Sequence, residues 1–239
     1  MQKEIIVKID LFILTIIPII GALLVFSIGG IKKHLKLLLT FSGAYLLSIV
    51  FLHIIPEIYQ SNAQNIGLLI LFGFFIQVLL DYFSRGIEHG HAHMHENTPL
   101  TGVLIGLYLH AFLEGIPLGM ADLTHLNENH SFLLGIVLHK LPIAIVLTSL
   151  LINHYKNNKK VIFQILLFAI MSPLGFIYGF YFNESFPLQS EHIMAIVVGI
   201  FIHVGTTIIF ESSDTHSINF AKLIAIILGF ILSVFLIAL

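Results

Sequence analysis

The sequence predicts an all-α polytopic membrane protein, a bundle of eight transmembrane helices with both termini outside. Three observations support this fold class. Hydrophobic residues make up 57% of the 239-residue chain and charged residues only 10%, against about 25% charged residues in soluble domains. The apolar residues gather in runs of about 20, the length that crosses a bilayer core. Positive charges gather in alternate connections between those runs, which favours one orientation in the membrane.

Each expected span is an apolar run long enough to cross a core about 30 Å thick at about 1.5 Å per residue. In chain order the runs are Leu11–Ile28, Leu35–Ile58, Ile66–Phe83, Leu100–Met120, Ser131–Ile152, Val161–Phe182, Ile193–Phe210 and Phe220–Leu239. A transmembrane barrel is excluded because its strands alternate polar and apolar residues over about 10 positions. The first run lacks a basic leader and a cleavage site, so we interpret it as a retained span. Residues 1–239 are expected to form one transmembrane domain.

Positive charges decide the predicted orientation. They lie in the first, third, fifth and seventh connections: Lys32, Lys33, Lys36, Arg85, Lys156, Lys159, Lys160 and Lys222. Only Lys3 and Lys8 oppose this pattern. The positive-inside rule places these connections in the cytoplasm, and an even number of spans then leaves both termini outside.

Charge and cysteine content narrow the chemistry. The formal net charge is -2, and the longest basic block is Lys32-Lys33, so the chain has no electrostatic footprint for nucleic acid. The chain contains no cysteine, which excludes disulfides, thiolate metal sites and a cysteine nucleophile. Any metal must therefore be bound by histidines and carboxylates.

Ionisable residues inside the fourth and fifth spans are the first functional candidates, because such residues are costly in a membrane. His110 and Glu114 are four residues apart and share one helical face. His139 and Lys140 precede Pro142 in the next span. At about 1.5 Å per residue, Glu114, His110 and His139 lie about 9, 15 and 12 Å below the outer surface. This set predicts a site for Zn²⁺ or a similar divalent ion.

Alternatives stay open for single members of this set. One buried histidine is as well explained by a hydrogen bond in the core as by a metal, and the metal hypothesis depends on three groups converging. Lys140 cannot bind a metal while protonated. It is expected to form an ion pair with Glu114, or to stand in for a second cation and compete for the same carboxylate; the two roles are compatible.

Two further spans carry polar residues at similar depth. His203 in the seventh span is expected as a supplementary ligand, and Ser172 lies near the middle of the sixth. Pro173 and Gly175 follow Ser172 and indicate either a gating kink or the ordinary frequency of Pro and Gly in membrane helices.

Carboxylates also lie where spans end. His53 and Glu57 are at the outer end of the second span, whereas Asp81 and Glu211 are at the inner ends of the third and seventh. We interpret them as the points where an ion is taken up and released. The alternative is plain solvation of a helix end.

The third connection, residues 86–98, is rich in histidine. His89, His91, His93 and His95 alternate with other residues in a segment expected to be a cytoplasmic loop. Short tracts of this kind capture metal ions without a fixed fold, and their affinity falls as imidazoles are protonated. A chance polar linker is the alternative.

These motifs resemble the Zrt-/Irt-like (ZIP) family of divalent metal transporters over nearly the whole chain. The matching residues are His110, Glu114 and Gly115 in the fourth span, His139, Lys140 and Pro142 in the fifth, His53, Pro56 and Glu57 in the second, and Glu211 at the end of the seventh. Departures are Ala111, Ile143 and Ser172, where members often carry Asn, Glu and Glu. The resemblance implies inward transport of a single ion, with Lys140 and Ser172 in place of a second site.

The function expected from these patterns is transport of zinc into the cytoplasm, extending to iron, manganese, cobalt and cadmium. The protein is then not an enzyme and has no tightly bound cofactor. Its partners are divalent metal ions and the lipid bilayer of a plasma or bacterial inner membrane, with a homodimer left open. An intramembrane metal-dependent hydrolase is the main alternative, although no His-Glu-x-x-His motif occurs. A haem-carrying helical bundle is a third class.

Overall fold

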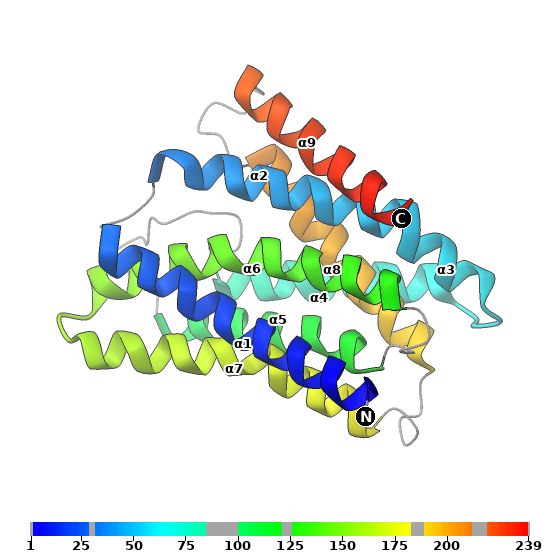
Figure 1. Cartoon of the computed structure of the whole chain (residues 1–239), viewed down its shortest axis with the longest axis horizontal. Helices are drawn as coiled ribbons and strands as arrows, with labels where there is room; N and C mark the ends of the chain where they lie inside the picture. The colour runs from blue at the N-terminus through cyan, green and yellow to red at the C-terminus, as the bar shows by residue number, and fades with distance from the viewer. Residues whose placement is uncertain are drawn as a thin grey trace.

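The computed structural model describes residues 2–28, 32–84, 100–120, 126–182, 189–211 and 219–238, and within these ranges it contains helices and no strand (Figure 1). The helices are α1 (Gln2–Ile28), α2 (Lys32–Ile49), η1 (Val50–Ile54), α3 (Ile55–Gln60), α4 (Ile66–Ser84), α5 (Leu100–Met120), α6 (Leu126–His154), α7 (Asn158–Phe182), α8 (Ser190–Glu211) and α9 (Phe220–Ile237).

The predicted fold class is confirmed for the described residues. Eight helical stretches are long and apolar enough to cross a membrane: Glu4–Ser27, Leu35–Gln60, Ile66–Ser84, Leu100–Met120, His130–His154, Asn158–Tyr181, Ser190–Phe210 and Phe220–Ile237. Their bounds differ most from the prediction in α1, which starts earlier because the helix continues through the more polar residues before Leu11. The start of α1 and the end of α9 lie toward the same end of the bundle (Figure 1). Which side of the membrane they face stays a prediction.

The helices differ in how deeply they lie in the bundle. The apolar windows of α5 and α6 are the most buried, whereas those of α4 and α9 are the least. Large apolar side chains remain exposed along the outer helices, for example Phe72 and Phe75 on α4 and Phe230 and Phe235 on α9. In a membrane these faces meet lipid, and α5 and α6 form the interior where ionisable side chains are placed.

Glycines bring two pairs of helices into backbone contact. A Cβ atom added to Gly115 of α5 would overlap the Ser172 carbonyl oxygen of α7, and one added to Gly175 of α7 would overlap the Phe112 carbonyl oxygen of α5. The second pair is α4 and α8, where Cβ atoms added to Gly73 and Gly199 would overlap backbone carbonyl oxygens of the facing helix. Small residues at such contacts let membrane helices approach closely, and helix association then comes from backbone packing.

The second span is interrupted near its C-terminal end. A π-helical turn, η1, joins α2 to α3, and Pro56 lies in the first turn of α3. A proline lacks the backbone N–H that would continue the regular ladder, and the π-helical turn lies directly before the helix that contains it. His53 lies within this turn, and Glu57 follows it in α3.

Candidate metal centre

Buried polar side chains from four helices meet in the interior of the bundle. They are Gln77 of α4, His110 and Glu114 of α5, His139 and Lys140 of α6, and Ser172 of α7, each at most 2% exposed. Five of the six were predicted as site residues from the sequence. Their shared location makes this cluster the candidate site.

The carboxylate of Glu114 is held by Lys140 and Ser172. The Lys140 ammonium donates hydrogen bonds to Glu114 Oε1 and to Ser172 Oγ, and it lies 5.0 Å from the centroid of the Phe168 ring. Ser172 Oγ is 2.9 Å from Glu114 Oε1 and 2.6 Å from the Ala111 carbonyl oxygen. The predicted ion pair between Lys140 and Glu114 is thus present. It compensates both charges in the buried interior, where either charge alone is costly.

The close approach of α5 and α7 produces this geometry. Gly115 follows Glu114 directly and lies against the backbone of Ser172. Because the two backbones are in contact, the short Ser172 side chain reaches from α7 to α5. Its hydroxyl group donates a hydrogen bond to the Ala111 carbonyl oxygen of α5.

His110 lies between Glu114 and a glutamine from α4. Its Nδ1 atom is 3.0 Å from Gln77 Oε1, and its Nε2 atom is 3.6 Å from Glu114 Oε2. With Gln77 accepting, Nδ1 carries the proton and the lone pair of Nε2 points toward the carboxylate. Such outer hydrogen bonds orient the histidines that bind metals.

Gln77 was missed by the sequence reasoning. It is fully buried in α4, and its contact with His110 joins α4 to α5. The available signal was that Gln77 is the only amide or charged residue in the apolar run 66–80. A neutral amide is less costly in a membrane than a charged group, so the sequence alone indicated Gln77 less strongly than the ionisable residues.

His139 is close to this cluster but is not in a preformed coordination shell. Its ring centroid lies 6.0 Å from that of His110, with the two rings at 76°. Within the part of the chain that the structure describes, no three His, Cys, Asp or Glu side chains are arranged so that they could hold a metal ion. His110, Glu114 and His139 therefore share one region, and only His110 and Glu114 face each other at near ligand spacing.

The other predicted residues lie elsewhere or outside the description. The ring of His203 packs on Phe74 with centroids 5.0 Å apart, at the contact between α8 and α4. His53 Nε2 lies 3.8 Å from Glu57 Oε2, whose side chain is 57% exposed. Asp81 is half-buried near the end of α4. Glu211 ends α8, but its side chain is outside the described part, as are His89, His91, His93 and His95.

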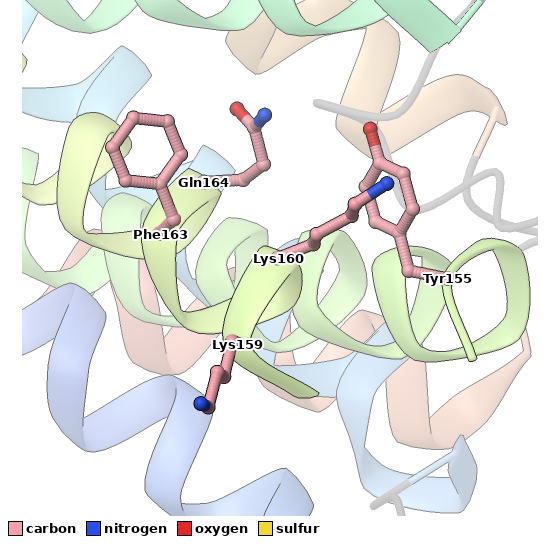
Figure 2. A pocket seen from close by; sticks show the side chains of 5 residues that line it. All are labelled: Tyr155, Lys159, Lys160, Phe163 and Gln164. Carbon is pink, nitrogen blue, oxygen red and sulfur yellow. The ribbon is translucent and has the colours of Figure 1, made fainter. Parts of the chain in front are cut away.

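A surface hollow of about 400 Å³ lies where α6 leads into α7 (Figure 2). Its lining residues are Tyr155, Lys159, Lys160, Phe163 and Gln164. Figure 2 shows the Lys160 ammonium beside the Tyr155 ring, and the two are 5.7 Å apart. The hollow contains none of the predicted metal ligands that the structure describes, so it is separate from the candidate site.

The fold and the buried cluster define a class of protein. A polytopic helical bundle with paired charges in its interior is typical of proteins that move ions or small polar solutes across a membrane. The model of the ZIP zinc transporter family matches residues 97–237, which include α5 to α9. The chain belongs to this family of transporters, which indicates divalent metal transport and does not favour the alternative of a hydrolase. Among curated proteins, no relative matches the chain.

Proposed function

We propose that this protein carries Zn²⁺ into the cytoplasm through a single-ion site of His110, Glu114 and His139. Iron, manganese, cobalt and cadmium are further cargo, because similar nitrogen and oxygen ligands accept several divalent ions. The observation that supports the site is that the two oxygens of the Glu114 carboxylate have different partners. Oε1 is held by Lys140 and Ser172, whereas Oε2 faces His110 Nε2 across 3.6 Å.

The spacing of His110 and Glu114 suits a small cation with modest adjustment. Zinc bonds to imidazole nitrogen and carboxylate oxygen of about 2.0–2.2 Å place two tetrahedral ligand atoms about 3.3–3.6 Å apart. The 3.6 Å between His110 Nε2 and Glu114 Oε2 is at the upper end of this range. His139 then completes the set by a change of its side-chain torsions, while Gln77 keeps His110 oriented.

Lys140 acts as the stand-in for a second cation. Its ammonium supplies a positive charge on one oxygen of Glu114, so a metal ion on the other oxygen meets repulsion. The repulsion is relieved when the ammonium withdraws from the carboxylate. Low pH opposes transport, since His110 and His139 bind a metal only as neutral imidazoles. Lys140→Ala should therefore change ion selectivity or pH dependence.

The remaining residues are assigned to the path of the ion. His53 and Glu57 receive it at the outer end of the second span, and His203 is a supplementary ligand. Asp81 and Glu211 lie where it leaves, and His89, His91, His93 and His95 capture it in the cytoplasm. This path rests on the orientation predicted from the lysines and arginines.

Uptake of radioactive zinc into liposomes containing the purified chain tests the site. Glu114→Ala and His110→Ala should each abolish most of the uptake, because each removes one of the two facing ligands. His154→Ala is the matched control, since His154 is exposed at the end of α6. Undiminished uptake in both ligand variants would remove this cluster from the mechanism, while family membership would still stand.

A further inference from the structure

A buried lysine at the start of α9 has no hydrogen-bond partner among the described residues. Lys222 is 4% exposed, although it lies in the first turn of a helix at the perimeter of the bundle. Its Nζ atom is shielded from solvent and makes no hydrogen bond within the described residues. A buried ammonium is costly unless an anion compensates its charge. The proposed metal path does not use this residue, so its burial needs another explanation.

The packing of α9 on α2 fixes where this side chain lies. Lys222 shares the buried face of α9 with small residues that include Gly229. A Cβ atom on Gly229 would lie 3.0 Å from the backbone nitrogen of Tyr45, so the two helices nearly touch there. Both helices run in the same direction (Figure 1). About two helical turns before Gly229, Lys222 is therefore level with Lys36 of α2.

Lys36 adds a second positive charge at the same level. It is exposed on the first turns of α2, and it is near enough to Lys222 to repel it electrostatically. Lys36 is thus exposed, whereas Lys222 is buried on the face of α9 that packs on α2. An anion that approaches Lys36 from outside reaches Lys222 next, and both charges favour its binding.

We propose that α2 and α9 bind the phosphate group of an anionic phospholipid between Lys36 and Lys222. The surrounding surface decides between a lipid and free phosphate. Phe220, Leu223 and Ile224 on the same turns of α9 are 77%, 45% and 41% exposed, and this apolar surface suits acyl chains. The first turn of a span also lies at the depth of the headgroups, and clustered lysines there attract anionic lipids.

The flexible stem of lysine makes this binding compatible with the buried position. Rotation about its four-carbon chain carries the Lys222 ammonium toward Lys36 without moving α9. The headgroup then gives the buried ammonium, which makes no hydrogen bond within the described residues, charge-assisted hydrogen bonds, which are among the strongest that proteins make. The site is independent of the metal cluster.

Native mass spectrometry of the full chain with phosphatidylglycerol or phosphatidylcholine tests this proposal. The wild-type chain should retain phosphatidylglycerol preferentially. Lys222→Met should weaken that binding by about tenfold, since one charged hydrogen-bond donor is lost. Lys222→Arg should keep the preference, because it keeps the charge. Lys159→Met is the matched control, since Lys159 is an exposed lysine near the start of α7 and should have no effect.

Three results would overturn the lipid site. They are equal retention of the two lipids by the wild-type chain, unchanged binding by Lys222→Met, and binding of inorganic phosphate in place of phosphatidylglycerol. The lipid comparison and the Lys222→Arg variant remain decisive even where Lys222→Met does not fold. Zinc uptake plays no part in this measurement, so its outcome is separate from that of the proposed transport site.

Discussion

The α5–α7 pair and the α4–α8 pair share one packing device and differ in the chemistry placed on it. In each pair, glycines on both helices bring the backbones into contact. The α5–α7 contact carries Glu114 and Ser172, joined by Lys140 from α6. The α4–α8 contact carries an aromatic pair, Phe74 and His203. Close packing alone therefore does not make a site.

The difference shows what the buried ionisable groups add. At α5–α7 the short distance between helices lets one serine hydroxyl reach a carboxylate and a backbone carbonyl group together. At α4–α8 a comparable approach supports ring packing. The hydrogen bond between Gln77 and His110 links α4 to α5 and so joins the two regions. Substitutions can still be made in each region separately.

The largest effect is expected from breaking the charge pair of the α5–α7 region. Lys140→Met leaves the Glu114 carboxylate buried without a counter-charge, and loss of one partner in such a pair costs about 3–5 kcal/mol. Thermal unfolding of the purified chain in detergent would measure this loss. Adding Glu114→Gln to Lys140→Met should restore most of the stability, because the stranded charge is then gone.

Lys160→Met is the control for that experiment, since Lys160 is an exposed lysine on α7. Equal unfolding temperatures for Lys140→Met and the wild-type chain would show that the pair does not hold the α5–α7 region together.

The glycine contacts should respond alike in the two regions. Gly115→Ala and Gly199→Ala each place a Cβ atom against a backbone carbonyl group of the facing helix. Overpacking of this kind costs about 1–3 kcal/mol, because neither backbone can move aside freely. At Gly102 the nearest atom would lie 3.7 Å from an added Cβ, so Gly102→Ala should be tolerated. A large loss of stability in only one of Gly115→Ala and Gly199→Ala would show that the two helix pairs are not packed equally closely.

The fold was largely readable from the sequence because it depends on local composition. Apolar runs of membrane length are visible without knowing which helices touch, and the eight spans matched the described helices closely. The π-helical turn η1 was not predicted, since the apolar pattern runs through it without a break. The glycine contacts were also missed, because a glycine in a membrane helix does not reveal which helix it faces.

The candidate site was predictable where its members are ionisable and at Ser172, a polar residue at similar depth beside a proline. Glu114 and Lys140 stand out in an apolar run, and their pairing follows from similar depth in neighbouring spans. Gln77 did not stand out, because its importance lies in a contact with a helix distant in sequence. The orientation of His139 depends on side-chain torsions, which sequence spacing does not fix.

A smaller effect is expected at the serine that spans α5 and α7. Ser172→Ala removes a hydrogen bond to the Ala111 carbonyl group and one partner of Lys140, and an unsatisfied buried group costs about 1–3 kcal/mol. Ser149→Ala is the matched control. The Ser149 hydroxyl bonds within its own helix, to the Ile145 carbonyl oxygen at 2.8 Å, so its loss should be minor. Thermal unfolding that ranks the two serines equally would contradict a bridging role for Ser172.

The smallest change in stability is expected at the aromatic contact of α4 and α8. His203→Phe keeps a ring against Phe74, and the somewhat larger phenyl ring should cost about 1 kcal/mol, the lower end of the range for overpacking. The same variant separates packing from metal binding, because phenylalanine cannot donate a lone pair to a cation. Zinc uptake by His203→Phe should fall, but less than uptake by His110→Ala, if His203 only supplements the α5–α6 ligands. An equal fall in both variants at unchanged stability would move the ion path toward α8, and unchanged uptake would leave His203 as a packing residue alone.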